Sequence, residues 1–143
     1  MFKYIFISAF SLIALKTCKT TPANLDDSQI KAVQVELKGT WQVINMYGID
    51  SLSKKSTLSF DTENKQVSGN AGCNRYNTTY TIKDSLITFG PAFSTKMYCN
   101  NMNIEKQFLG LLKKVFYFKY QDGNLIFLST TNEKLLILSA IEE

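Results

Sequence analysis

The stretch Ser68-Gly-Asn-Ala-Gly-Cys-Asn-Arg-Tyr-Asn77 lies near the middle of the chain and determines how its neighbours are interpreted. Its glycines permit backbone conformations that are closed to other residues, and its asparagines favour turns because their side chains bond nearby backbone. Residues 66–71 overlap its beginning and form one predicted strand. Residues 78–82 follow it and alternate polar and apolar side chains, which is typical of a second strand. We therefore predict a tight, glycine-dependent turn between two strands.

Strand patterns continue outward from this turn in both directions. Asp122-Gly123 separates two of them and predicts a two-residue hairpin, because both residues tolerate positive φ. The sequence predicts a mainly β fold, an antiparallel meander of about eight strands curled into a barrel-like sheet with one α-helix packed on it. The remaining predicted strands are residues 40–46, 56–61, 85–89, 116–120, 125–128 and 134–138.

The helix is predicted at residues 100–115, where apolar residues recur at the spacing of a single helix face. Asn101 or Asn103 is expected to cap its start, and Glu105 suits the positive end of the helix dipole. We expect this helix to cover the sheet rather than to bind a partner, because one apolar face is what packing requires. The apolar residues are Ile104, Phe108, Leu111, Leu112 and Val115.

The N-terminus resembles an export signal. Lys3 precedes an apolar run at positions 4–15, which is too short to span a bilayer and has the length of a secretory h-region. Leu15-Lys16-Thr17-Cys18 then resembles a bacterial lipobox, which predicts lipid attachment at Cys18; ordinary signal cleavage is the alternative. We expect residues 1–17 to be a signal peptide, 18–36 a lipid-anchored tether and 37–143 the folded domain. Residues 27–37 fit a short helix or a strand.

The chain has three cysteines, and an odd number in an exported protein requires an explanation. A lipid on Cys18 leaves Cys73 and Cys99, and export places this pair where disulfides form. A Cys73–Cys99 disulfide is therefore predicted. Closing that loop contributes on the order of 3.5 kcal/mol in the chain-entropy model.

Composition excludes several classes of function. The 143 residues suit one domain and contain no histidine, which excludes Ser-His-Asp and Cys-His nucleophile systems and imidazole metal sites. The net charge of +4 is spread over scattered lysines, so no nucleic-acid interface is expected. We expect no enzyme activity, no metal and no cofactor.

Three segments together resemble the META domain, the HslJ-like family of small bacterial envelope proteins. They are Gly39-Thr-Trp41, the stretch 68–77 quoted above, and Phe89-Gly-Pro-Ala-Phe-Ser-Thr-Lys-Met-Tyr-Cys99 with Glu105 and Phe108 after it. The similarity covers about residues 37–141. It implies a β-rich, barrel-like fold with one helix, and exported or lipid-anchored members linked to heat or envelope stress. It implies no established enzymatic activity, so no catalytic residue is carried over.

The candidate binding residues are Asn70, Asn74, Arg75 and Tyr76. Arg75 is the only arginine in the chain, and arginine is favoured where a planar fork meets a carboxylate or a ring. We expect it to bond Glu105 or a carbonyl internally; contact with an anionic ligand or partner is the alternative.

The sequence thus predicts a monomeric, non-enzymatic domain anchored by lipid in the bacterial envelope, at the outer membrane, with a stress-related or supporting role. The alternative is a binding module for a small hydrophobic ligand or an envelope protein.

Overall fold

The computed structural model describes residues 37–53, 55–100 and 102–141. The predicted signal peptide, Cys18, the tether and nearly all of the predicted element at 27–37 lie outside the described residues. Within the part that is described, no helix is long and apolar enough to cross a membrane.

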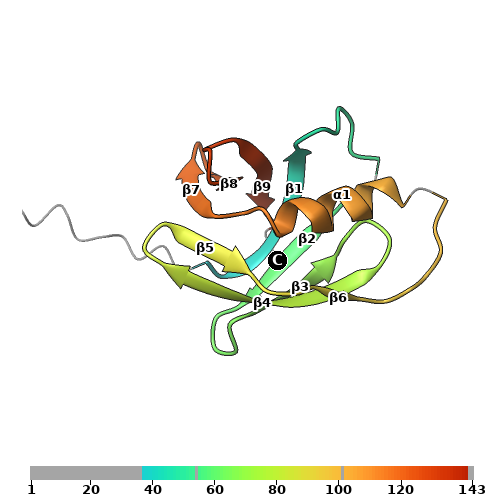
Figure 1. The fold of residues 1–143 in the computed structure, drawn as a ribbon, viewed down its shortest axis with the longest axis horizontal. Coiled ribbons are helices and arrows are strands. Elements are labelled where there is room, and N and C mark those ends of the chain that lie inside the picture. Colours follow the sequence, from blue (N-terminus) through green and yellow to red (C-terminus); the bar gives the residue numbers. More distant parts are fainter. Residues whose placement is uncertain (1–36, 54, 101, 142–143) are drawn as a thin grey trace, which may run out of the picture. The chain divides into compact units, whose positions relative to one another are not determined.

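The described residues form nine strands and one helix (Figure 1). The helix α1 (Asn103–Leu112) lies between the sixth and seventh strands in the sequence. The strands are β1 (Gly39–Met46), β2 (Thr57–Asp61), β3 (Gln66–Asn70), β4 (Arg75–Lys83), β5 (Leu86–Phe89), β6 (Phe93–Ser94), β7 (Tyr117–Gln121), β8 (Asn124–Leu128) and β9 (Lys134–Ala140).

All strand pairs are antiparallel, and their hydrogen bonding closes into a ring. The order runs β3-β2-β1-β9-β8-β7-β5-β4-β6, and an additional pairing joins β3 to β4. The shortest strand pairing in the ring is that between β5 and β7, whose register contains the single pair Leu86–Tyr117. The predicted antiparallel fold with one helix is confirmed. The two-residue strand β6, which pairs with β4, was not predicted.

The alternation in β4 shows how the sequence chooses its inner face. Tyr76, Thr78 and Tyr80 are buried, whereas the residues between them are exposed. This strand begins at Arg75, three residues before the predicted one, so the end of the glycine-containing stretch is itself a strand. The hairpin after β7 is also as predicted, since Asp122 and Gly123 have φ of 52° and 75°.

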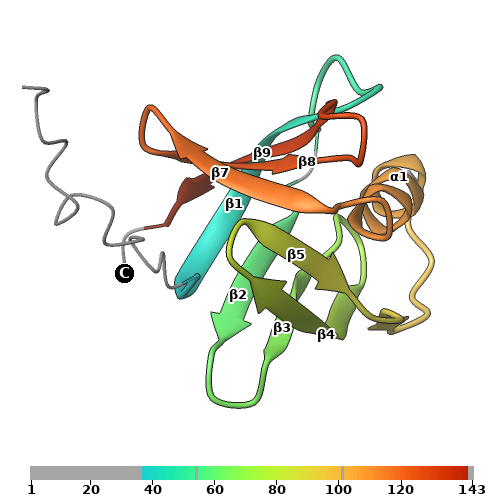
Figure 2. The ribbon, with the colours of Figure 1, turned by 60° about the vertical axis from the view of Figure 1, so that its left-hand side comes forward.

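The helix packs its apolar face toward the strands, beside one end of the ring (Figure 2). Phe108 is fully buried, and its ring meets that of Tyr76 edge-on with centroids 5.3 Å apart. The helix is shorter than the predicted 100–115. Asn103 is the first helical residue and not the N-cap, a position that Met102 occupies without a side-chain cap bond; the other predicted cap, Asn101, lies outside the described residues. The loop before α1 is instead fixed by contacts with the turn after β3.

Candidate functional site

The turn between β3 and β4 is shaped by local hydrogen bonds. The Asn70 Oδ1 atom accepts a bond of 2.7 Å from the backbone N–H of Gly72, and the Ala71 N–H bonds the Asn74 carbonyl at 2.8 Å. Gly72 has φ of +113°, a conformation that residues with a Cβ rarely adopt. At Gly69 a Cβ would collide with the Thr57 carbonyl oxygen of β2. The two glycines thus allow the turn and the close approach of β3 to β2.

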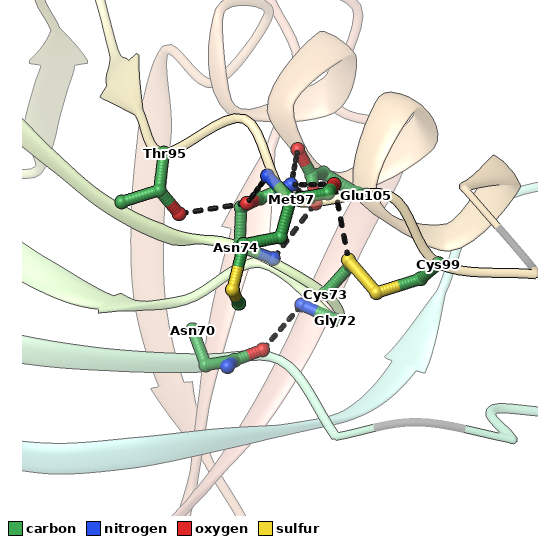
Figure 3. The surroundings of a disulfide bond; sticks show 8 residues. All are labelled: Asn70, Gly72, Cys73, Asn74, Thr95, Met97, Cys99 and Glu105. Atoms are coloured by element: carbon green, nitrogen blue, oxygen red, sulfur yellow. Dashed lines mark hydrogen bonds between the residues drawn. A yellow bond between two sulfur atoms is a disulfide. The ribbon is translucent and has the colours of Figure 1, made fainter.

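A buried polar pair joins this turn to the helix (Figure 3). Glu105, in the first turn of α1, accepts bonds from the Asn74 backbone N–H at 2.9 Å and from its Nδ2 at 3.0 and 3.2 Å. Both side chains are buried. A buried carboxylate is costly unless hydrogen bonds and nearby positive ends of dipoles compensate it, and both are present here. The pair therefore ties the turn to α1.

The same Asn74 side chain holds the loop that precedes the helix. Its Oδ1 accepts bonds from the Met97 N–H and the Thr95 hydroxyl, both at 2.7 Å. Its Nδ2 donates to the Met97 carbonyl at 3.1 Å. The amide thus pairs with both backbone groups of Met97, much as a neighbouring strand would (Figure 3). One asparagine consequently connects three segments, the turn, the loop and the helix.

The Cys73–Cys99 disulfide lies beside this network, as predicted (Figure 3). The two Cα atoms are 6.2 Å apart, within the normal range for such a bond. The Met97 carbonyl oxygen is 3.7 Å from the Cys73 sulfur. Because a disulfide sulfur has no proton to donate, this approach is a van der Waals contact. The loop is therefore held covalently at position 99 and by hydrogen bonds at positions 95 and 97.

Tyr76 continues the inner face below the turn. Its hydroxyl donates to the Thr57 carbonyl at 3.1 Å, and burial raises the pKa of the phenol. The neutral phenol is therefore stabilised in the fold. Its ring packs against Phe108, and its hydroxyl is hydrogen-bonded to the backbone of β2.

Arg75 does not make the predicted bond to Glu105. It is the first residue of β4, and its side chain lies on the outer, exposed face. The neighbouring Asn74 faces inward and donates the hydrogen bonds that the Glu105 carboxylate accepts. Among the described residues, its side chain makes no hydrogen bond or ion pair. The prediction failed because alternation places neighbouring residues on opposite faces. Counting back from Tyr80 would have placed Asn74 inside and Arg75 outside.

The four candidate binding residues are therefore brought together in the chain but not on one surface. Asn74 and Tyr76 are buried, Asn70 is half-buried in the turn, and Arg75 is exposed. Their role in binding stays a prediction. In the described part of the chain, no group of three or more acidic or cysteine side chains is arranged to hold a metal ion. The geometry is that of a clamp, in which polar groups satisfy one another and fix a loop.

The clamped loop lies in the segment Phe89–Cys99 that carries the family resemblance, but of its residues only Cys99 was given a structural role from the sequence. Thr95 and Met97 contribute through a hydroxyl and a backbone, and such contacts have no sequence pattern. The loop also displays three large exposed side chains, Phe93, Met97 and Tyr98. The sequence did hold one signal for their exposure. These apolar residues lie outside every predicted strand and helix, so no periodic pattern assigns them to a buried face.

The META domain model matches residues 33–142. No curated protein sequence matches significantly.

Two solved structures show the same fold at low sequence identity. A protein from Burkholderia xenovorans, solved by NMR, is 21% identical with a TM-score of 0.61, covering 74% of this chain and 83% of its own. A crystal structure of a DUF4847 family protein from Bacteroides vulgatus is 12% identical with a TM-score of 0.56, covering 74% of this chain and 94% of its own.

Proposed function

The chain belongs to the META domain family, and on this premise we propose that it is a non-enzymatic domain of the bacterial envelope. In this proposal a lipid on Cys18 anchors it to the membrane, at the outer membrane, and residues 18–36 tether the domain. Its role is to support envelope integrity under stress. It acts as a monomer and needs no cofactor.

The observation that supports a non-enzymatic role is that the polar side chains at the turn and at the start of α1 point into the protein and bond one another or the backbone. Asn74, Glu105 and Tyr76 are buried, and each bonds another protein group. A general acid or base must reach the proton that it transfers. These groups are instead committed to joining the turn, the loop and the helix. The absence of histidine from the chain points in the same direction.

The envelope part is supported by the N-terminal sequence. Lys3, the apolar run at 4–15 and the lipobox-like Leu15-Lys16-Thr17-Cys18 are arranged as in exported lipoproteins. The Cys73–Cys99 disulfide is consistent with an oxidising compartment outside the cytoplasm.

The alternative of a small hydrophobic ligand is not favoured by the packing. Such a ligand needs space among the strands and the helix. Phe108 and Phe127 are both fully buried there, together with aliphatic side chains from most strands. The ligand would have to displace this core.

The test is the intact mass of the protein produced in a lipoprotein-processing bacterium, with Cys18→Ser as the matched control. We expect a chain that begins at Cys18 and carries added acyl mass, whereas the control lacks that mass. Two thiols should become alkylatable only after reduction. A wild-type chain without acyl mass would contradict the proposed anchor. Loss of complementation by Cys18→Ser in a deletion strain under envelope stress would then link the anchor to the role.

A further inference from the structure

The connection between β5 and α1, which contains the two-residue strand β6, exposes three large apolar side chains. Phe93 is 72% exposed, Met97 59% and Tyr98 88%, all within six consecutive positions. Single exposed apolar residues are normal on proteins, but three in one short loop indicate a contact. In both views of the fold this connection runs along the outside of the domain (Figures 1 and 2). We call residues 93–98 the apolar loop.

The backbone of the apolar loop is fixed while its side chains stay outside. The Thr95 N–H bonds the Arg75 carbonyl at 3.0 Å, Asn74 binds both backbone groups of Met97, and Cys99 is cross-linked just beyond. A fixed loop cannot fold its apolar side chains back onto the core. It also loses little conformational entropy on binding, which favours association. The clamp therefore presents this surface in a preformed state.

The exposed charges within the apolar loop and on the paired strand β4 are positive. Lys96 lies within it and is exposed, and Arg75 lies on the exposed face of the neighbouring strand β4. No acidic residue occurs between Phe89 and Ile104. Each basic residue near an anionic bilayer contributes about 1 kcal/mol of attraction. Aromatic side chains beside lysine are also the composition of membrane–water interfaces.

The length of the chain before the domain favours a lipid bilayer as the partner of the apolar loop. Residues 18–36 span at most about 65 Å even when fully extended, so a domain anchored at Cys18 stays close to the bilayer. This step rests on the proposed function. A tethered loop meets the bilayer at a high effective concentration, so even a weak contact is populated.

We propose that the apolar loop contacts the membrane, with Phe93, Met97 and Tyr98 entering the interface of an anionic phospholipid bilayer beside Lys96 and Arg75. The domain then lies against the membrane in one orientation, with the clamp of Asn74, Glu105 and the disulfide setting the shape of the contact. This is an interaction surface distinct from the lipid anchor.

The test places a tryptophan in the apolar loop by Tyr98→Trp in the full lipidated chain. The protein is reconstituted into vesicles of equal parts phosphatidylglycerol and phosphatidylcholine, with or without brominated acyl chains. Tyr47→Trp is the matched control, because Tyr47 is 52% exposed but follows β1, outside the loop. The native Trp41 is buried and common to both variants. We expect blue-shifted emission, quenched by brominated lipid, for position 98 and unquenched emission for position 47.

Flotation of the same vesicles separates this inference from the proposed function. Protein that does not float contradicts the lipid anchor. The membrane contact is then tested by adding the unanchored protein to the vesicles and measuring the emission and quenching of the tryptophan at position 98. Protein that floats while position 98 stays solvent-like and unquenched overturns the membrane contact. A photo-cross-linker at position 98 that yields a discrete protein adduct also overturns it, since the occupant is then a protein. Lys96→Glu should lower quenching in anionic vesicles and leave it unchanged in purely phosphatidylcholine ones.

Discussion

Replacing Asn74 by alanine is expected to destabilise the domain far more than its size suggests. The side chain bonds Glu105, Met97 and Thr95 at once. A hydrogen bond to a charged group contributes about 1.5–3 kcal/mol and a neutral one about 1 kcal/mol. The exposed Thr95 and Met97 can bond water instead, so we count about 1 kcal/mol for them together and about 2 kcal/mol for Glu105.

We therefore expect Asn74→Ala to lower the free energy of unfolding by about 3 kcal/mol, which for a domain of this size lowers Tm by roughly 10–15 °C. Urea unfolding followed by circular dichroism measures the change. Asn77→Ala is the matched control, since Asn77 belongs to the same motif but is exposed on β4, and it should change stability by less than about 0.5 kcal/mol.

A double-mutant cycle assigns the loss to the right partner. Asn74→Ala and Glu105→Ala share one buried network, so their effects should fail to add, with a coupling of about 1–3 kcal/mol. Equal stability losses at positions 74 and 77, or additive effects at 74 and 105, would refute the reasoning that this network holds the fold together.

Three further predictions concern the cross-link, a buried phenol and the helix. Reducing the Cys73–Cys99 bond, or replacing both cysteines by serine, should lower the free energy of unfolding by about 3.5 kcal/mol in urea titrations, and an unchanged midpoint would argue against the bond. Burial raises the pKa of Tyr76, so the unfolded chain releases the phenol proton more readily than the folded one. The contribution of Tyr76 to the free energy of unfolding is therefore complete below about pH 10 and is lost as the pH rises further. Tyr76→Phe should flatten the alkaline fall in stability, and equal slopes would contradict this. Gly110→Ala should stabilise α1 by about 0.5–1 kcal/mol, because an added Cβ meets nothing within 4 Å; a lower Tm would contradict it.

Much of the fold followed from patterns that depend on the sequence alone. Alternation located most strands, Asp122-Gly123 located a hairpin, and the spacing of Ile104 and Phe108 located the helix. These signals are local, because they arise from the geometry of a single element. Strand β6 was missed because two exposed residues, Phe93 and Ser94, carry no such pattern.

The site was predicted only in part, because its contacts are not local. The sequence identified Asn74, Glu105 and both cysteines as notable, but it predicted that Arg75 bonds Glu105 or a carbonyl. Charge complementarity suggested that pair, whereas the face of each residue on β4 decides it. The bonds of Asn74 to the backbone of Met97 join positions far apart in the chain, and a backbone acceptor leaves no trace in residue type.

Amide hydrogen exchange at Met97 tests most directly whether Asn74 clamps the apolar loop. Met97 is an exposed loop residue, yet its N–H is bonded to the buried Asn74 at 2.7 Å. We predict that this amide is protected like those of β4 in the wild type and exchanges freely in Asn74→Ala. Free exchange in both proteins would contradict the clamp, and with it the preformed surface proposed for the membrane.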